Sequence, residues 1–303
     1  MTELLSTKGL SKKYGSRFAL KDADIHIHQG DIDGLIGLNS AGKTTLLKLI
    51  NSQITKTSGD IYNKGKLMQF GKPGIKIGAL VESPGLYPDC TAYENLKYKC
   101  IALGKNKKSY ITELLDVVEL ADTGRKKAKQ FSLGMKQRLS IALALVDEPD
   151  LLMLDEPING MDPQGIKDIR EMLVSINRSK GTTILISSHI LDELSKFATN
   201  YGIIRDGMVL REFTREQLNQ ENRSGIEIQS PEINKVEQLL REEMKLTDIE
   251  RIDQTTIMIK DSVEHYPQIS RFLFDQGIYV SQFSVRHESL EDYFMSMTGG
   301  SKL

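Results

Sequence analysis

The sequence predicts an α/β protein built on a parallel sheet, followed by a small α+β domain of ferredoxin-like order. Up to about Arg211, short apolar runs alternate with helical patterns, and some runs, such as Leu151–Leu154, are apolar at every position. Continuous apolar runs are typical of strands that helices cover on both faces. After Arg211 the chain becomes polar, and a second series of strand and helix patterns begins.

Composition and charge narrow the classes of protein that fit. The chain has 303 residues, of which 27% are charged, and its net charge is −1. This is ordinary globular composition without an electrostatic footprint for nucleic acid, so we expect no nucleic-acid partner. Two cysteines without metal-type spacing, Cys90 and Cys100, fit packing roles in a reduced cytosolic setting. We expect no signal peptide and no membrane-spanning run, so work at a membrane would require another chain.

The expected elements follow in chain order. Thr91 with Glu94 has the spacing of a capping box, and Asp162 before Pro163 is typical of a helix start. The strands expected in the first part are Asp24–His28, the "LIG" that ends at Gly37, Ile75–Val81, Leu151–Asp155, Thr182–Ser188 and Tyr201–Arg205.

We expect a first domain at 1–211, a linker with one short helix at 212–223, and a small domain at 224–303. The small domain shows the order β-α-β-β-α-β, which is that of the split βαβ fold. Its expected elements are "GIEIQ", a helix capped by Ser230-Pro231, "DIERID", "TTIMIK", a helix near Val263–Phe274, "IYVSQFSV" and a helix near Leu290–Met297.

A phosphate-binding turn stands between an expected strand and an expected helix. "GLNSAGKT" fits the pattern G-x-x-x-x-G-K-[ST], in which backbone N–H groups cradle phosphates. Lys43 would bridge the β- and γ-phosphates, and Thr44 would place its hydroxyl on Mg²⁺. Ser40 stands where a third glycine is common, and we expect it to fit with an ordinary backbone angle. The expected nucleotide-binding residues here are Gly37, Leu38, Asn39, Ser40, Ala41, Gly42, Lys43, Thr44 and Thr45.

Two acids end an expected strand in "LLMLDEP". Ligands of open α/β sheets bind at the carboxyl ends of strands. Asp155 would therefore hold Mg²⁺, through water, and Glu156 would act as general base toward the attacking water. Alone, such a pair is more typical of a solvated loop; the upstream phosphate-binding turn and the run of four apolar residues favour the functional interpretation.

Taken in order, the motifs of Leu4–Leu210 resemble the ATP-binding subunits of ABC transporters. They are Tyr14 in "KKYGSRFAL", the phosphate-binding turn, "FSLGMKQR", "LLMLDEPINGMDP" and His189 in "ISSHI". The resemblance implies a P-loop ATPase core with an antiparallel β subdomain and a helical subdomain at about 83–147. It also implies ATP and Mg²⁺ as cofactors.

The resemblance extends the site to a second chain. Ser132 and Gly134 would belong to a signature loop that binds the γ-phosphate of ATP on a facing subunit, which implies an isologous dimer. Tyr14 would stack on adenine, and His189 would contact the γ-phosphate and the water. Asp162 would serve both as helix N-cap and at the dimer interface.

One position departs from the family. Glu82 stands where most members carry a glutamine that senses Mg²⁺, and it can still offer oxygen to the metal or to water. Within the family, "ESP…Y…TAYENL" resembles the exporters of bacitracin resistance and lantibiotic immunity. Residues Glu82–Asn95, with Leu86, Tyr87 and Tyr93, would line either a groove for a permease helix or the interior of the helical subdomain.

We therefore expect an ATPase subunit, cytoplasmic and peripheral on the inner face of the membrane, that drives separate permease subunits and exports a peptide antibiotic or similar amphiphile. The alternatives are another cargo, such as sodium, haem, lipid or a sugar polymer, and a soluble ATP switch acting on nucleic acid or the ribosome. A plain P-loop kinase would lack "SLGMKQR".

Overall fold

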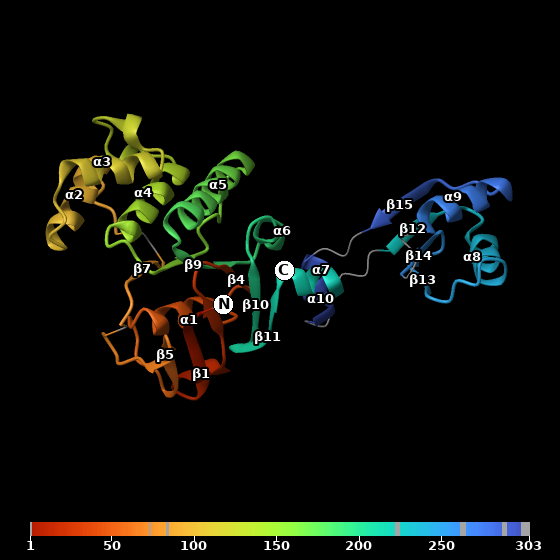
Figure 1. Ribbon diagram of the computed structural model, residues 1–303, viewed down its shortest axis with the longest axis horizontal. Coiled ribbons are helices and arrows are strands. Elements are labelled where there is room, and N and C mark those ends of the chain that lie inside the picture. The colour runs from red at the N-terminus through yellow and green to blue at the C-terminus, as the bar shows by residue number, and fades with distance from the viewer. Residues whose placement is uncertain are drawn as a thin grey trace. The chain divides into compact units, whose positions relative to one another are not determined.

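The computed structural model describes residues 2–72, 74–82, 85–221, 225–260, 265–286 and 290–297. The chain forms two compact units, Met1–Arg215 and Glu216–Lys302 (Figure 1). The division falls inside the segment expected as a linker. The expected start of the helical subdomain at 83 and the expected helix start at Val263 lie outside the described residues.

A six-stranded sheet organises the larger unit, with the strand order β11-β10-β4-β9-β8-β7. All neighbours are parallel except β11, which pairs antiparallel with β10 at one edge. The α/β prediction is thereby confirmed. The strands are β4 (Ile32–Ile36), β7 (Ile77–Leu80), β8 (Leu151–Asp155), β9 (Thr183–Ser188), β10 (Asn200–Arg205) and β11 (Met208–Thr214).

Strand β11 extends further than the sequence pattern indicates. Residues 212–214, which we expected in the linker, belong to this strand. Phe213 is buried and stacks on Tyr201 of β10 with 5.3 Å between ring centroids. The ring holds the strand on the sheet where the surrounding polar residues suggested a loop.

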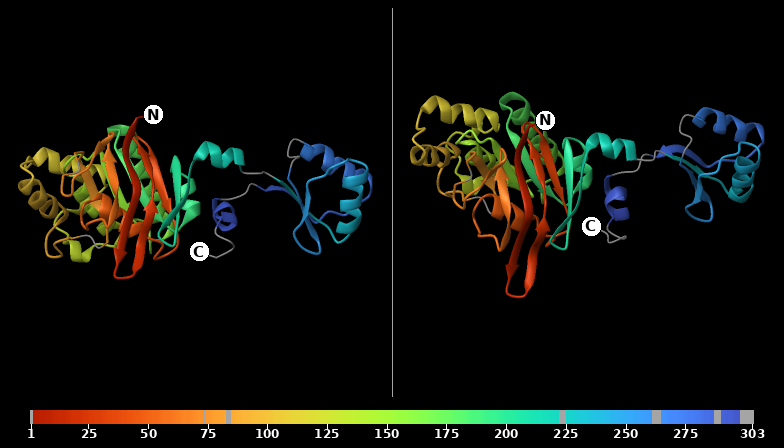
Figure 2. Two further views of the ribbon diagram at one scale, coloured as in Figure 1. Left: turned by 90° about the horizontal axis from the view of Figure 1, so that it is seen from below. Right: turned by 60° about the horizontal axis from the view of Figure 1, so that its bottom comes forward.

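A second sheet is antiparallel, with the order β2-β1-β5-β6 and with β3 paired to β1. Figure 2 shows β1 and β2 as the long red hairpin. Only β3 was placed from the apolar pattern, because β1 carries irregular register shifts that break the alternation. The strands are β1 (Glu3–Tyr14), β2 (Arg17–Ala23), β3 (His26–His28), β5 (Ser58–Asn63) and β6 (Lys66–Leu67).

Helix α1 (Lys43–Ile50) joins the two sheets into one core. It buries Leu46, Leu47, Leu49 and Ile50. The same cluster contains side chains from β1 and β2 on one side and from β4, β8 and β9 on the other. The start of α1 is thereby fixed against both sheets, and this start is where the phosphate-binding turn ends.

Three helices that contact one another lie together at one side of the unit, α2 (Ala92–Ala102), α3 (Lys108–Val117) and α4 (Leu133–Leu145) (Figure 1). Thr91 and Glu94 form the expected capping box of α2. Asp162 caps α5 (Pro163–Lys180) by accepting from the N–H of Gly165, also as expected. A short helix, α6 (Leu191–Ser195), follows β9. In the described ranges no helix is both long enough and apolar enough to cross a bilayer.

The smaller unit has a four-stranded antiparallel sheet with the order β13-β14-β12-β15. Its core contains apolar side chains of the strands and of α8 and α9, among them Ile226, Val236 and Ile269. The elements are α7 (Arg215–Glu221), β12 (Gly225–Gln229), α8 (Ile233–Glu242), β13 (Ile249–Arg251), β14 (Thr256–Ile259), α9 (Tyr266–Asp275), β15 (Gln282–Arg286) and α10 (Leu290–Met297).

The start of α8 differs from the expectation that Ser230 caps it. The N-cap is Glu232, without a side-chain cap. The Ser230 hydroxyl instead accepts from the N–H of Glu232 at 3.1 Å and donates to the Tyr279 carbonyl at 2.6 Å. It therefore ties the end of β12 to the segment before β15.

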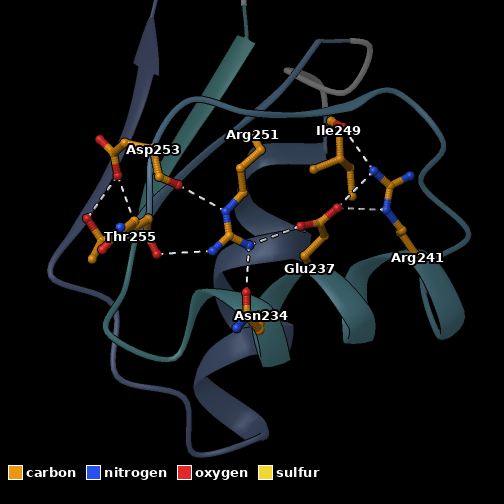
Figure 3. A network of polar contacts seen from close by, with 8 residues as sticks. Asn234, Glu237, Arg241, Ile249, Arg251, Asp253 and Thr255 are labelled. Carbon is orange, nitrogen blue, oxygen red and sulfur yellow. Dashed lines mark hydrogen bonds and ion pairs between the residues drawn. The ribbon is translucent and has the colours of Figure 1, made fainter.

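Polar contacts fasten α8 to β13 (Figure 3). Glu237 accepts from Arg241 at 3.0 Å and from Arg251 at 3.3 Å, and Arg251 also donates to the side chain of Asn234 at 2.7 Å. Arg241 further donates to the Ile249 carbonyl at 2.9 Å. Because several charges share one network, it fixes the helix on the strand better than isolated surface pairs would.

A buried carboxyl lies near the beginning of β4. Asp33 is 7% exposed, and its Oδ1 accepts from Asn200 of β10 at 3.1 Å. Its Oδ2 has no hydrogen-bond partner among the described residues. Burial, together with the charges of Asp31 and Glu212 and against the Asn200 hydrogen bond, raises the pKa of Asp33 to about 8. The protonated form is therefore favoured in the folded chain.

The raised pKa of the buried Asp33 carboxyl predicts that the stability of the fold depends on pH. The folded chain binds the Asp33 proton more tightly than the unfolded chain, so the free energy of unfolding falls as pH rises from about 4 to about 8. The slope from one such group reaches about 1.4 kcal/mol per pH unit. Denaturant unfolding of the Asp33→Asn variant across this pH range should give a free energy of unfolding that lacks this dependence on pH. The exposed Asp116 of α3 provides a control, because Asp116→Asn should keep the slope; equal slopes in all three proteins would contradict the account.

Candidate functional site

The phosphate-binding turn connects the end of β4 to the start of α1. At two glycines of this turn there is no room for a side chain. A Cβ on Gly37 would lie 2.4 Å from the Ile204 carbonyl oxygen, and one on Gly42 would lie 2.8 Å from that of Ala19. Gly42 also has a φ of 112°, which side chains disfavour. The turn is therefore pressed against β10 and β2.

Ser40 departs from the expectation of an ordinary backbone angle. Its φ is 67°, in the left-handed region. A residue with a Cβ costs about 1–2 kcal/mol there relative to its preferred conformations. The serine is therefore strained, and its small hydroxymethyl group lines the cavity described below.

Lys43 is turned back onto its own loop. Its side chain is 5% exposed, and its Nζ donates to the carbonyl oxygens of Gly37 at 2.5 Å and Leu38 at 3.1 Å. The same ammonium lies 3.0 Å from Oε1 of Glu156. The buried cation thus has three oxygen partners, two of which are neutral carbonyls that a phosphate can replace.

Asp155 ends β8 with both oxygens engaged by hydroxyls. Oδ2 accepts from Oγ1 of Thr44 at 2.7 Å, and Oδ1 accepts from Oγ of Ser187 at 2.6 Å. Thr44 comes from α1, and Ser187 comes from β9, which lies between β4 and β8 in the sheet. The strand ends therefore bring Thr44 and Asp155 together as the sequence predicted.

Glu156 stands between two nitrogens. Its Oε1 faces Lys43, and its Oε2 lies 2.8 Å from Nδ1 of His189. The backbone of Glu156 has a φ of 48°, and its N–H donates to the Ser187 hydroxyl at 3.0 Å. The structure thus forms a line from Lys43 through Glu156 to His189, three residues that the sequence placed in one site.

A cavity of about 580 Å³ opens over this turn. Its walls combine the turn, the β1–β2 hairpin and the turn between β10 and β11. The described lining residues are Tyr14, Arg17, Phe18, Ala19, Leu38, Asn39, Ser40, Ala41, Gly42, Lys43, Thr44, Thr45, Glu156, Asp206 and Gly207. Tyr14 is 54% exposed, and Nζ of Lys12 lies 4.9 Å from the centroid of its ring.

The expected residues of the second half-site lie on other elements and are not among the described residues that line this cavity. Ser132 is the N-cap of α4, and its hydroxyl accepts from the N–H of Met135 at 3.2 Å. Gly134 lies in the first turn of α4, where a Cβ would be 3.1 Å from the Met161 Cε. Asp162, beside Met161, starts α5. The three residues therefore form a group separate from the phosphate-binding turn of the same chain.

Glu82 also lies outside the described lining of the cavity. Its side chain is 63% exposed, and its carboxylate pairs with Nζ of Lys48 in the last turn of α1. The φ of Glu82 is 66°, so the chain bends sharply here. In this conformation the carboxylate neutralises a lysine and does not join Thr44 and Asp155.

The oxygen donors present fit a magnesium ion. Mg²⁺ prefers one or two protein oxygens together with phosphates and several waters. The hydroxyl of Thr44 and the carboxylate of Asp155 lie in contact at the mouth of the turn, and either can serve directly or through water. Among the described residues no group of three or more His, Cys, Asp or Glu side chains could hold a metal by itself, so phosphate oxygens would have to complete the shell.

Six contributors to the site were missed from the sequence: Arg17, Phe18, Ala19, Ser187, Asp206 and Gly207. Ser187 had a signal, because a fully buried hydroxyl in the apolar run of β9 needs a polar partner. Asp206-Gly207 had the signal of a tight hairpin turn. Neither signal indicates which distant loop the residue contacts.

Comparisons with known proteins agree with this geometry. Residues 20–159 match the family described as ABC transporter. The chain is 38% identical over its whole length to the bacitracin transport ATP-binding protein BcrA of Bacillus licheniformis, covering all of that protein. It is 38% identical to the uncharacterized ABC transporter ATP-binding protein YcbN of Bacillus subtilis (strain 168), covering 99% of it. It is 42% identical over 69% of its length to the lantibiotic transport ATP-binding protein SrtF of Streptococcus pyogenes, covering 90% of that protein.

Solved structures share the fold. A solved ATP-binding subunit of an ABC transporter is 30% identical, with a TM-score of 0.62, over 72% of this chain and 92% of its own. A dimeric ATP-binding cassette in a post-hydrolysis state with bound ADP and phosphate has a TM-score of 0.62 at 24% identity, over 70% of this chain and 99% of that one.

The strain at Ser40 gives a prediction for stability. Ser40→Gly should raise the free energy of unfolding by about 0.5–1 kcal/mol, because relief of the left-handed backbone outweighs the extra entropy of glycine in the unfolded chain. Ser40→Val should lower it by more than 1 kcal/mol, because a β-branched residue tolerates this region poorly. Denaturant unfolding measures both; a destabilised glycine variant would show that the serine hydroxyl supplies a needed contact.

Proposed function

Because the chain belongs to the family of ABC transporter ATP-binding proteins, we propose that it is the ATP-hydrolysing motor subunit of an exporter. One observation carries the proposal. Lys43, the Thr44–Asp155 pair and the Glu156–His189 pair meet at one edge of the parallel sheet, beside a cavity that Tyr14 borders. These are the groups that phosphate binding, metal binding and activation of water require.

The chemistry follows from exchange of partners at Lys43. When the triphosphate enters the turn, its oxygens replace the Gly37 and Leu38 carbonyls on the ammonium. The phosphate charge also competes with Glu156 for the lysine. Glu156 is then free to accept a proton from the attacking water as general base, and His189 positions the carboxylate and the γ-phosphate. A magnesium ion held by Thr44 and Asp155 would neutralise charge that develops on the phosphates.

The site of one chain is incomplete, so we propose that it works as a dimer. Ser132 and Gly134 stand at the start of α4 and are not among the described residues of their own chain's cavity. A helix N-terminus whose capping hydroxyl still has its own proton to donate suits a phosphate. Two chains facing each other would each offer this start, with Asp162 nearby, to the ATP of the other, most simply as a homodimer.

A second cavity suits the membrane partner. It measures about 450 Å³ and includes Tyr87, Tyr98 and Asn95 among its lining residues. Tyr87 and Tyr98 are 56% and 47% exposed and meet edge to face at 5.5 Å. Exposed aromatic side chains around a groove fit the insertion of a short helix. We propose that permease subunits dock here and hold the chain at the inner face of the membrane.

The cargo is proposed from the relatives. BcrA is named for bacitracin transport and SrtF for lantibiotic transport, and the first of these aligns over the whole chain. A peptide antibiotic, or a similar amphiphile, is therefore the proposed cargo. Another cargo such as sodium, haem or lipid, and a soluble switch on nucleic acid or the ribosome, remain the alternatives that fit the same ATP site.

The role of Glu156 gives the test of the motor. Glu156→Gln keeps an oxygen toward Lys43 but cannot take up a proton from water, so ATP hydrolysis should fall by at least 100-fold. ATP should remain bound between two chains, and size-exclusion chromatography with ATP and Mg²⁺ should show a dimer. Ser132→Ala added to Glu156→Gln is the matched control and should weaken that dimer. Normal ATP hydrolysis by Glu156→Gln would show that Glu156 is not the general base. If Glu156→Gln stays monomeric with ATP and Mg²⁺, the proposal that two chains share each ATP would be contradicted.

A further inference from the structure

The β1–β2 hairpin presents two side chains to the nucleotide cavity. Tyr14 and Arg17 are directly paired residues at the end of the hairpin, joined by the turn of Gly15 and Ser16. Directly opposed residues of antiparallel strands project to the same face. Both residues line the cavity. Arg17 therefore lies beside the ring on which the base is proposed to stack.

The other charged groups of the cavity are already engaged. Lys43 pairs with Glu156, and Asp206 pairs with Arg205 at 3.3 Å. Arg17 is exposed, and within the described part of the chain it makes no ion pair or side-chain hydrogen bond. It is therefore the one cation among the described lining residues that remains available to an entering ligand.

The order of groups in ATP determines what Arg17 can reach. Lys43 holds the β- and γ-phosphates at the turn, and Tyr14 holds the base at the other end of the cavity. The α-phosphate lies between them, on the ribose side, and it is the anionic group nearest the base. A guanidinium presents a planar fork of donors that suits two phosphate oxygens.

We propose that Arg17 is a nucleotide-binding residue whose guanidinium contacts the α-phosphate of ATP or ADP bound to its own chain. This proposal rests on the proposed ATPase function. It assigns affinity to Arg17 but no part in hydrolysis, because the γ-phosphate and its water lie at Lys43, Glu156 and His189. Because the α-phosphate is the same in ATP and GTP, this contact should not discriminate between the two bases.

The test is calorimetric titration of the full chain with Mg-ADP. Arg17→Met should raise the Kd about tenfold, which is about 1.4 kcal/mol. The KM for ATP and for GTP should rise by the same factor, whereas kcat should stay within twofold. Arg17→Lys should recover part of the affinity, because it restores the charge without the fork. Lys21→Met is the control, since Lys21 is an exposed cation of the same strand outside the described lining, and it should leave the Kd unchanged.

The outcomes separate this proposal from the one it rests on. An unchanged Kd in Arg17→Met, with normal binding by the unaltered chain, would overturn the role of Arg17 alone. A rise in the KM for ATP but not for GTP would also overturn it, because the side chain would then read the base. If the unaltered chain and Lys43→Ala bind Mg-ADP equally poorly, the proposed ATPase function itself fails.

Discussion

The ion pair between Lys43 and Glu156 is the interaction on which the site depends. The ammonium of a lysine that is 5% exposed has little contact with water, so the fold must supply polar partners for it. The fold supplies them by ending β4 and β8 at the same edge of one sheet, with β9 between them. The lysine then has one charged partner and two neutral ones. In the mechanism proposed above, the triphosphate replaces the two neutral partners.

At this edge of the sheet, the side chains of Asp155 and Glu156 each contact two other residues. Asp155 holds Thr44 and Ser187 and so connects α1, β8 and β9 before any metal is bound. Glu156 joins Lys43 to His189, which follows β9. Because these bonds link three elements, the distances between the proposed catalytic groups are set by the sheet. Helices α4 and α5 begin at Ser132 and Asp162, which we propose act on the ATP of a second copy.

Local motifs explain what the sequence could predict. The glycine turn, the strand ending in Asp155 and the cap at Asp162 are each encoded within a few residues, and all were placed correctly. The backbone of Ser40 was not, because nothing within the motif indicates that its φ lies in the left-handed region. The extension of β11 depends on Phe213 packing across the sheet, and the pairing of Glu82 with Lys48 depends on a distant helix. Such contacts have no local signature.

We propose that ATP hydrolysis at this site powers a membrane partner. The most direct measurement is to tag the chain at its C-terminus, extract native membranes in mild detergent, and identify copurifying proteins by mass spectrometry. A Tyr87→Ala, Tyr98→Ala double variant provides the matched control, because it alters the proposed docking cavity and spares the nucleotide cavity. We expect a polytopic membrane protein in near-stoichiometric amount with the unaltered chain and its loss from the variant. Recovery of only ribosomal or other non-membrane partners would contradict the claim.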